Sequence, residues 1–301
     1  MSAPAKLPEC ARYSFGADEF IFVEIDETMS LEAFFIAKSL ADAIESQHID
    51  GVTDICVTNS SLLIRYNPDS IAPAALLPQI QRLEEGVRHE ASRTLPTRVF
   101  EVPVWYNDPY TLETASRFRK NHQTPDKTDL EFTAEINGLD RESLIEQHHS
   151  IPWMITTVGF VAALPFMYQM TSRARQLEAP KYLSPRTDTP RLAVGHAGCF
   201  TVIYSVRGAG GYQLLGMAAA PVFDPHNALA DFSESMVLFR SGDIVKFKSI
   251  DEAEYEAISA RCENGTFRYQ RAELDFDLDE WRDDPDTYNK RILEALRGSD
   301  H

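Results

Sequence analysis

The sequence has few cysteines, and they are widely scattered. Cys10, Cys56, Cys199 and Cys262 form no Cys-x-x-Cys pair. This spacing disfavours a structural zinc site and a disulfide framework, and it is typical of a protein of the reducing cytoplasm. We therefore expect a cytoplasmic location and no metal site in this chain.

Long apolar runs and an excess of basic side chains are also missing. The most apolar stretch, residues 158–170, is shorter than the ~20 residues of a membrane helix, and Pro165 interrupts it. The chain has 29 Lys and Arg against 46 Asp and Glu, which gives a formal net charge of −17. A surface of that sign repels a phosphate backbone and an anionic lipid surface. The composition thus argues against nucleic acid and membranes as partners.

What remains is an ordinary globular composition, 44% hydrophobic and 25% charged over 301 residues. At roughly 100–200 residues per domain, this length predicts two domains. Residues 20–105 alternate between strand-like and helix-like patterns in the order β-α-β-β-α-β, which is typical of a ferredoxin-like layer. The expected strands are 20–25, 52–58, 61–66 and 97–105, and the expected helices are 31–44 and 73–89.

Beyond residue 105 the pattern changes. Short helices are expected at 111–120 and 140–148, and after Trp153 short apolar runs alternate with glycine and proline, which is typical of a β-sandwich or barrel. An acidic tail follows, with a helical region over 279–296 that breaks near Asp284-Pro285. We therefore expect an α+β protein in four parts, namely an α+β subdomain (1–104), a helical connector (105–150), a β-barrel (151–260) and an acidic C-terminal extension (261–301).

The most unusual stretch is residues 181–198, where prolines and glycines place polar side chains on irregular backbone. Its polar candidates are Lys181, Tyr182, Arg186, Thr187 and His196. Loops on a rigid scaffold often carry binding residues, so this stretch is a candidate site. The alternative is a solvated connection between strands, in which the lysine and the arginine are ordinary surface charges.

Two further motifs are candidates. Gly208, Gly210 and Gly211 precede Tyr212 and Gln213, and such glycines permit close backbone approach, either in a hairpin or to a ligand. No Gly-Lys-Ser/Thr follows them, so they do not form a phosphate-binding loop.

The other motif is His148-His149. Adjacent histidines cannot face the same way on a helix, which makes them a poor metal pair. A simpler interpretation is that the two histidines lie at the end of a helix, where a positive charge is favourable.

Residues 181–213 resemble the allophanate hydrolase subunit 1 family, also known as the carboxyltransferase subdomains C and D of urea carboxylase. The B subunit of 5-oxoprolinase is a shorter member of that family. The residues that carry the resemblance are Lys181-Tyr182, Arg186-Thr187, Thr189-Pro190, Ala193-Val194-Gly195, Gly198 and Gly210-Gly211-Tyr212-Gln213. Weaker matches extend it from Arg12 to Phe276.

The resemblance implies an α/β N-terminal subdomain followed by a cyclophilin-like β-barrel. It further implies one half of a two-subunit carboxyltransferase that moves a carboxylate from carboxybiotin to an amide-type nitrogen. The implied partners are an allophanate hydrolase subunit 2-like protein, a biotin carboxylase and a biotin carrier, with a small amide as substrate. Biotin is expected on the separate carrier and not on this chain.

In such a reaction, cations stabilise negative charge, which is the catalytic role expected of Lys181 and Arg186, with His149 as a third candidate. The expected substrate-binding residues are Tyr182, Thr187, Gly195, His196, Gly198, Gly210, Gly211, Tyr212 and Gln213. Residues 159–164 depart from the Gly-Phe-x-Pro-Gly-Phe of shorter members, so urea is not assumed as the acceptor. Two alternatives stay open, namely the B subunit of an ATP-dependent 5-oxoprolinase-like lactam hydrolase and a non-catalytic regulatory relative.

Overall fold

The structure is a computed structural model that describes residues 7–89 and 94–298. Of these, residues 7–89, 94–95 and 277–279 form a first compact unit, and residues 96–276 and 280–298 form a second. The boundary between the units falls at residue 95, whereas the sequence suggested residue 104. Residue 104 lies inside one continuous strand, Thr94–Tyr106. The expected helical connector and the C-terminal extension both belong mainly to the second unit.

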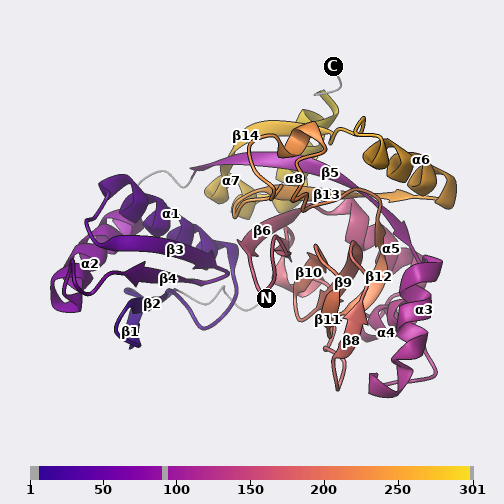
Figure 1. Ribbon diagram of the computed structural model, residues 1–301, viewed down its shortest axis with the longest axis horizontal. Helices are drawn as coiled ribbons and strands as arrows, with labels where there is room; N and C mark the ends of the chain where they lie inside the picture. Colours follow the sequence, from indigo (N-terminus) through magenta and orange to yellow (C-terminus); the bar gives the residue numbers. More distant parts are fainter. Residues whose placement is uncertain (1–6, 90–93, 299–301) are drawn as a thin grey trace. The chain divides into compact units, whose positions relative to one another are not determined.

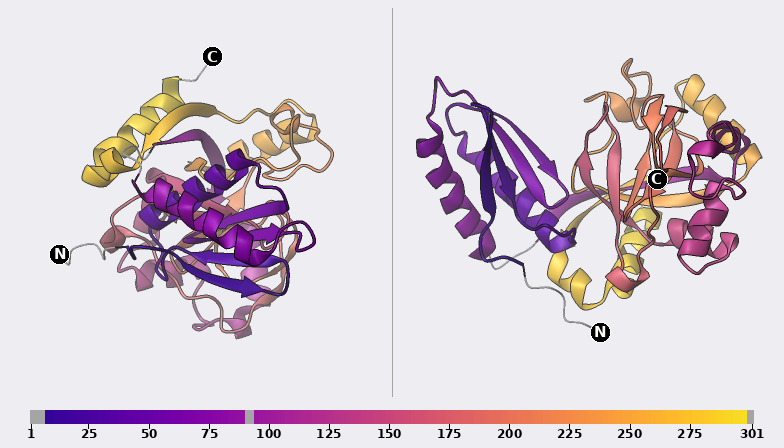
Figure 2. Two further views of the ribbon diagram at one scale, coloured as in Figure 1. Left: turned by 90° about the vertical axis from the view of Figure 1, so that its left-hand side faces the viewer. Right: turned by 90° about the horizontal axis from the view of Figure 1, so that it is seen from below.

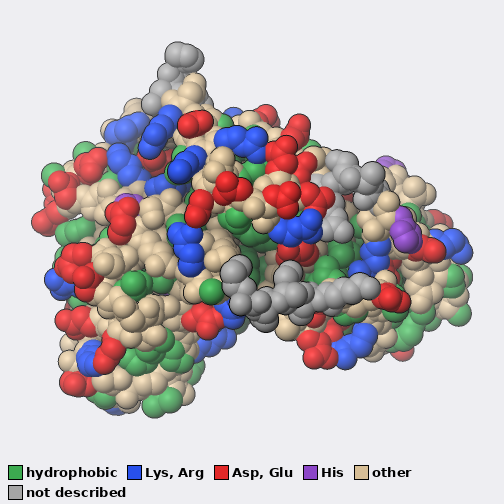
Figure 3. All heavy atoms as spheres, turned by 180° about the vertical axis from the view of Figure 1, so that it is seen from behind, with side chains coloured by type: hydrophobic (Ala, Val, Ile, Leu, Met, Phe, Trp, Pro, Cys, Tyr) green, Lys and Arg blue, Asp and Glu red, His purple; other side chains and the backbone are tan. Residues whose placement is uncertain are grey.

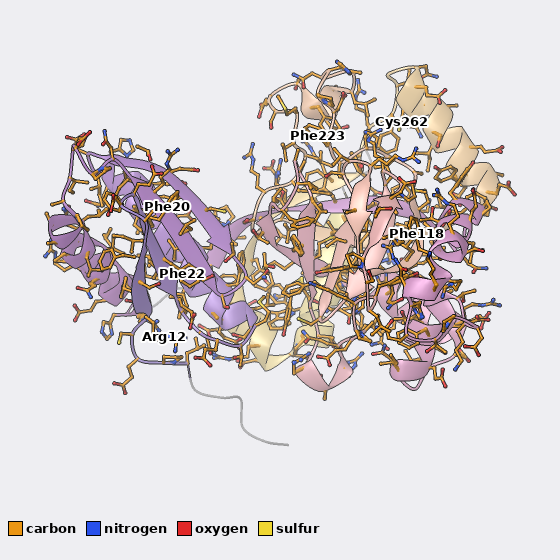
Figure 4. The ribbon with its side chains drawn as sticks, turned by 60° about the horizontal axis from the view of Figure 1, so that its bottom comes forward. Arg12, Phe20, Phe22, Phe118, Phe223 and Cys262 are labelled. Carbon is orange, nitrogen blue, oxygen red and sulfur yellow. The ribbon has the colours of Figure 1, made fainter. Side chains whose placement is uncertain are left out.

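The first unit is a four-stranded antiparallel sheet with two helices on one face (Figures 1 and 2). On β2, Ile21 and Val23 are fully buried, while Phe20 and Phe22 (Figure 4) alternate to the opposite face and are half-buried. Ser30 caps the first helix by accepting a hydrogen bond from the Ala33 amide. The strands β1 (Arg12–Gly16), β2 (Phe20–Glu24), β3 (Val52–Thr58) and β4 (Ser61–Tyr66) run in the order β1-β2-β4-β3, and the helices are α1 (Leu31–Gln47) and α2 (Pro73–His89).

The expected α/β layer is confirmed, but the strand predicted to complete it is wrong. Residues 97–105 were expected to be the last strand of this layer, but the sheet of the first unit does not contain them, and its fourth strand is β1, which pairs with β2. The predicted residues belong to β5 (Thr94–Tyr106), a strand of the second unit. The consecutive residues Val99 and Phe100 are both fully buried, so both faces of β5 need cover. The edge of a sheet with helices on one face only cannot supply it.

The second unit confirms the β-barrel. Seven strands follow the order β12-β9-β10-β7-β6-β13-β5, and pairing of β12 with β5 closes the ring. An odd number of strands cannot alternate in direction all the way round, and the one exception is the parallel pair β13–β5. The strands are β6 (Trp153–Val158), β7 (Pro165–Gln169), β9 (Ala193–Ala197), β10 (Phe200–Ile203), β12 (Gln213–Ala218) and β13 (Ile244–Ile250).

Two smaller strand pairings and several helices complete this unit. β14 (Arg271–Asp277) adds to β5, while β8 (Arg186–Thr189) and β11 (Gly208–Gly210) form a separate two-stranded ribbon. The helices are α3 (Pro109–Arg117), α4 (Asp129–Ile136), α5 (Arg141–Ser150), α6 (Glu252–Glu263), α7 (Leu278–Asp283) and α8 (Pro285–Gly298). The predicted break at Asp284-Pro285 is confirmed, whereas the apolar spacing did not predict α4 or α6.

The surface carries charges of both signs. On the face that Figure 3 shows, acidic and basic side chains are interspersed, so the net negative charge is not gathered there into one patch. Over residues 7–89 and 94–298, no helix combines the length and apolar character that crossing a bilayer requires.

Closure of the barrel depends on Gly216 in β12. A Cβ at this position would lie 2.5 Å from the carbonyl oxygen of Trp105 and 2.9 Å from the Cα of Tyr106. Both are backbone atoms of the paired strand and cannot move aside cheaply. We expect Gly216→Ala to lower the free energy of unfolding of the second unit by about 2–4 kcal/mol.

Urea denaturation measures this loss. The matched control is Gly159→Ala in the same unit, where no atom lies within 4 Å of the added Cβ. Equal stability of the two variants would contradict the account of barrel closure.

Candidate functional site

The segment that follows Pro180 lies against the ribbon and the start of β12. The Tyr182 amide donates to the Gly211 carbonyl oxygen at 2.8 Å, and the Lys181 ammonium lies 5.5 Å from the centroid of the Tyr212 ring. Arg186 is the ribbon partner of Gly210. The structure thus brings together seven of the predicted residues, Lys181, Tyr182, Arg186, Gly210, Gly211, Tyr212 and Gln213.

Arg186 is fully buried. Its Nε donates to Thr189 Oγ1 at 3.3 Å, and its Cζ lies 4.6 Å from the centroid of the Tyr182 ring, a cation–π contact. Burial raises the pKa of Tyr204 and the neighbouring Arg186 guanidinium opposes that rise, so the Tyr204 hydroxyl lies beside this cation. No carboxylate of the described chain is bonded to Nη1 or Nη2. Leaving a buried charge without a partner costs several kcal/mol, so this arrangement is expensive for the protein alone.

The buried carboxylate of this region, Asp129, is hydrogen-bonded to groups other than Arg186. Asp129 accepts hydrogen bonds from Arg119, from the Tyr182 hydroxyl at 2.6 and 2.8 Å, and from the Leu214 amide at 2.8 Å. Burial, and then the Asp129 charge, raise the pKa of Tyr182 well above its usual value, which keeps that hydroxyl neutral. Asp129 therefore neutralises Arg119 and holds Tyr182, and it leaves Arg186 without a counter-ion.

The carboxylate nearest to Arg186 in sequence is committed too. Asp188 forms ion pairs with Arg207 at 2.6 Å and with Arg117 at 3.2 Å. The Arg207 guanidinium, followed by that of Arg117, lowers the pKa of Asp188 to about 2. This carboxylate is therefore ionised and shared between two surface arginines.

Two of the predicted glycines make room for the protein's own rings. A Cβ on Gly210 would lie 2.6 Å from Cε1 of Tyr204, and one on Gly195 would lie 3.0 Å from Cβ of Tyr212. Gly198 has a φ of +58° and its amide and carbonyl pair with Ala179, so it serves a turn between β9 and β10. The sequence predicted close backbone approach at these glycines. At Gly195 and Gly210 a tyrosine of the protein occupies that space, and at Gly198 the glycine allows a turn.

Two predicted polar residues are committed to internal contacts. The Tyr182 hydroxyl binds Asp129, and the Gln213 amide accepts from His122 Nε2 at 2.9 Å and donates to the Pro180 carbonyl oxygen at 2.8 Å. These side chains position the segment around Lys181. Thr187 is exposed on β8.

His149 and His196 lie apart from this cluster. His149 is half-buried on α5, with its Nε2 3.1 Å from Glu146 Oε2, and no described contact joins it to Lys181 or Arg186. His196 faces the barrel interior with no exposed surface, because alternate residues of β9 point inward. Both of its ring nitrogens are bonded within the protein, so the structure does not support its expected role in substrate binding.

Inside the barrel, His196 belongs to a directional chain of hydrogen bonds. Its Nε2 donates to the Leu177 carbonyl oxygen at 3.1 Å, so its Nδ1 accepts from the Thr201 hydroxyl at 2.8 Å. Thr201 in turn accepts from His148 Nε2 at 3.0 Å, and His148 Nδ1 accepts from the Tyr106 hydroxyl at 2.7 Å. Every member is satisfied only when both imidazoles are neutral.

Burial explains this neutrality. It lowers the pKa of His196 to about 4 and that of His148 well below its usual value. The expectation that His148 acts as a cation at a helix end is therefore wrong. The helix-end position is correct, but the side chain turns into the barrel instead of toward water.

Sequence reasoning missed three residues of the cluster. They are Asp129, Tyr204 and Gln123, whose Nε2 donates to the Lys181 carbonyl oxygen while its buried Oε1 has no partner among the described residues. The capping box formed by Thr128 and Glu131 marks the start of α4 in the sequence, but it does not reveal that Asp129 is buried.

Other candidate sites offer less. Among the described residues, no group of three or more His, Cys, Asp and Glu side chains is arranged to hold a metal ion. One open surface depression contains none of the predicted residues. It is lined by Glu142, Ser143, Glu146, Gln147, Ser150, Ile151 and Arg175.

Comparison with known proteins places these residues in context. A family model described as carboxyltransferase domain, subdomain C and D, matches residues 11–231. The urea amidolyase of Lachancea kluyveri is 26% identical over 270 residues, which cover 88% of this chain and 15% of that protein. The 5-oxoprolinase B subunit of Bacillus subtilis is 28% identical over 250 residues, which cover 80% of this chain and 93% of that protein.

Similarity of structure extends further than similarity of sequence. A crystal structure of the Kluyveromyces lactis urea carboxylase matches 98% of this chain and 27% of that chain, with a TM-score of 0.82 and 22% identity. At this identity the match defines the fold. This chain thus spans only a small part of the urea amidolyases and urea carboxylase it matches, but nearly all of the 5-oxoprolinase B subunit.

Proposed function

The chain belongs to the family of carboxyltransferase domains, subdomain C and D, and from this membership we propose that it is one half of a two-subunit carboxyltransferase. The complex is cytoplasmic and transfers a carboxylate to an amide-type nitrogen of urea, guanidine or another small amide. Its other members are an allophanate hydrolase subunit 2-like protein, a biotin carboxylase and a biotin carrier. The observation that carries the proposal is the buried Arg186, whose two terminal N–H₂ groups have no carboxylate partner among the described residues.

The residues present fit a carboxylated ureido group in two respects. Arg186 offers N–H donors that have no carboxylate partner in the described chain, and Gln123 Oε1 offers an open acceptor to an N–H group. Carboxybiotin on the carrier would supply the carboxylate for transfer to the acceptor nitrogen, and its ureido nitrogen would take up the acceptor's proton; Arg186 would hold the carboxylate oxygens and Gln123 Oε1 would accept from an N–H group. The chain's own task is to hold the oxygens and stabilise their charge.

Lys181 supplies the second cation of this site. Its side chain is exposed at the edge of the cluster, over the Tyr212 ring, whereas Arg186 is enclosed. An exposed ammonium at that edge suits a group that arrives on a carrier from outside. Tyr182 and Gln213, which are bonded internally, fix the backbone on either side of the lysine.

We expect Lys181→Ala to lower kcat by at least ~10²-fold, because a cation that stabilises developing charge is removed. The measurement is ATP- and bicarbonate-dependent turnover of urea, guanidine and small lactams by the purified complex. Lys248→Ala is the matched control, since that exposed lysine lies on β13, pairs with Glu254 of α6 and should leave turnover unchanged. A fall of less than roughly threefold for Lys181→Ala would remove this lysine from the mechanism.

A second candidate is the B subunit of an ATP-dependent lactam hydrolase. The observation in its favour is the near-complete coverage of the Bacillus subtilis 5-oxoprolinase B subunit. Affinity purification from the native cell distinguishes the two functions, because a biotinylated carrier supports carboxylation and its absence beside a small barrel-type partner supports the hydrolase. A non-catalytic regulatory role would instead leave the activity of the complex intact in Lys181→Ala.

A further inference from the structure

The open end of Arg186 has a defined chemistry. Nε is already bonded to Thr189, so the donors that remain for a ligand are the two terminal nitrogens, which lie side by side in one plane near the Tyr204 hydroxyl. Two coplanar donors on one positive charge match the two oxygens of a carboxylate or a bicarbonate. A phosphate dianion would need more donors, and no further buried cation contacts this guanidinium in the described chain.

No carboxylate of residues 7–89 and 94–298 fills this position. Asp129 is saturated by Arg119, Tyr182 and the Leu214 amide, and Asp188 is held at the surface by two other arginines. A buried guanidinium normally has a carboxylate partner, and here both carboxylates of the region are tied to other groups. The missing partner is therefore expected from outside the chain.

A ligand can reach Arg186 only if something moves, because the side chain has no exposed surface. The three residues between Tyr182 and Arg186 are all exposed, with Leu183 at 77%, and they have no regular secondary structure. Within the described chain, two hydrogen bonds, both to Asn121, secure them. The Ser184 amide donates to the Asn121 carbonyl oxygen, and the Asn121 Nδ2 donates to the Pro185 carbonyl oxygen, each at 3.3 Å.

These two bonds, like the Arg186 Nε contact with Thr189, are slightly longer than the usual upper limit of about 3.2 Å for N–H···O contacts. Tyr182, by contrast, is held by Asp129 and by the Gly211 carbonyl oxygen at 2.6 to 2.8 Å. Residues 183–185 can therefore lift from Asn121 while Tyr182 stays in place under the guanidinium.

We propose that Arg186 is the receptor for a small planar oxyanion of the carboxylate or bicarbonate class, and that residues 183–185 are a cover, latched by Asn121, that opens to admit it. This proposal rests on the proposed function and deepens it by naming the group bound and its route. It assigns the oxyanion to the enclosed Arg186. The exposed Lys181 interacts instead with negative charge outside the cover.

The test is a calorimetric and NMR titration of the full chain, without partner, ATP or biotin, using sodium acetate and sodium bicarbonate as probes. We expect saturable binding that Arg186→Met and Arg186→Lys both lose, the second because lysine keeps the charge without the planar fork. Lys181→Ala should change the dissociation constant by less than ~3-fold, because a charge outside the cover is screened by solvent. Sodium chloride at equal ionic strength should not compete.

The latch has its own readout. Asn121→Ala removes one of its two bonds, so the Ser184 amide should exchange with deuterium faster, and acetate should bind ~2–5-fold more tightly as the open form gains population. Acetate binding that persists in both Arg186 variants, equal competition by chloride, or no saturable binding even in Asn121→Ala would overturn the proposal. Because no carboxylation is measured, loss of anion binding in an active complex refutes only this inference, whereas binding by a chain whose complex never carboxylates refutes only the proposed function.

Discussion

Arg186→Met is expected to abolish carboxyl transfer while leaving the second unit as stable as before, or more stable. Methionine fills a similar volume without charge, and replacing a buried charge by an apolar side chain is often neutral or stabilising by about 1–4 kcal/mol. The substitution loses the cation–π contact with Tyr182, worth about 0.5–2 kcal/mol, and the bond to Thr189, worth about 0.5–1.5 kcal/mol. These terms nearly cancel, whereas the loss of the oxyanion's donors should lower kcat by ~10²–10³-fold.

Arg119→Met is the matched control in the same cluster. Arg119 is paired with the buried carboxylate of Asp129, so its removal leaves an uncompensated charge. Breaking a buried pair in this way costs about 3–5 kcal/mol. Urea denaturation of the two variants, together with turnover of the complex, separates the roles. If Arg186→Met destabilised the fold as much as Arg119→Met, Arg186 would be a structural residue and the proposed function would lose its main support.

Elements fixed by local signals could be predicted from the sequence. The strands 52–58 and 61–66 and the helix 73–89 match β3, β4 and α2, and the break at Pro285 separates α7 from α8. In each case the apolar spacing, a turn or a proline lies within the element itself. The destination of β5 could not be predicted, because burial on both of its faces, supplied by the barrel, decides which sheet it joins.

The same distinction explains the candidate site. Lys181, Tyr182 and Arg186 are close in sequence and could be proposed together. Asp129 joins them through the Tyr182 hydroxyl, 53 residues along the chain, and no local pattern predicts that contact. His196 was placed with the ligand because it lies in the same proline- and glycine-rich stretch as Lys181 and Arg186. Every residue of β9 is buried, so alternation in polarity does not show which face is inward.

Acidification from pH 7 to pH 4 is expected to destabilise the second unit through the two histidines inside the barrel. Burial lowers the pKa of His196 from 6.5 to about 4, so between these values the unfolded chain binds a proton that the folded chain does not. The stabilisation is complete above pH 6.5 and is lost as the pH falls toward 4. At 1.36 kcal/mol per pH unit, His196 alone accounts for about 3 kcal/mol, and His148 acts in the same direction.

Urea denaturation at pH 7, 6, 5 and 4 measures this loss, and His196→Gln is the variant that isolates it. The variant should be less stable at pH 7, because the hydrogen-bond chain is cut. Glutamine does not titrate, so the slope of the unfolding free energy against pH should correspond to about one fewer proton taken up on unfolding. The ion-paired carboxylate of Asp188, with a pKa of about 2, titrates below this range and does not obscure the difference. Identical slopes for the variant and the unaltered chain would mean that His196 takes up its proton in the folded barrel, and that Thr201 reverses its hydroxyl to accept from it.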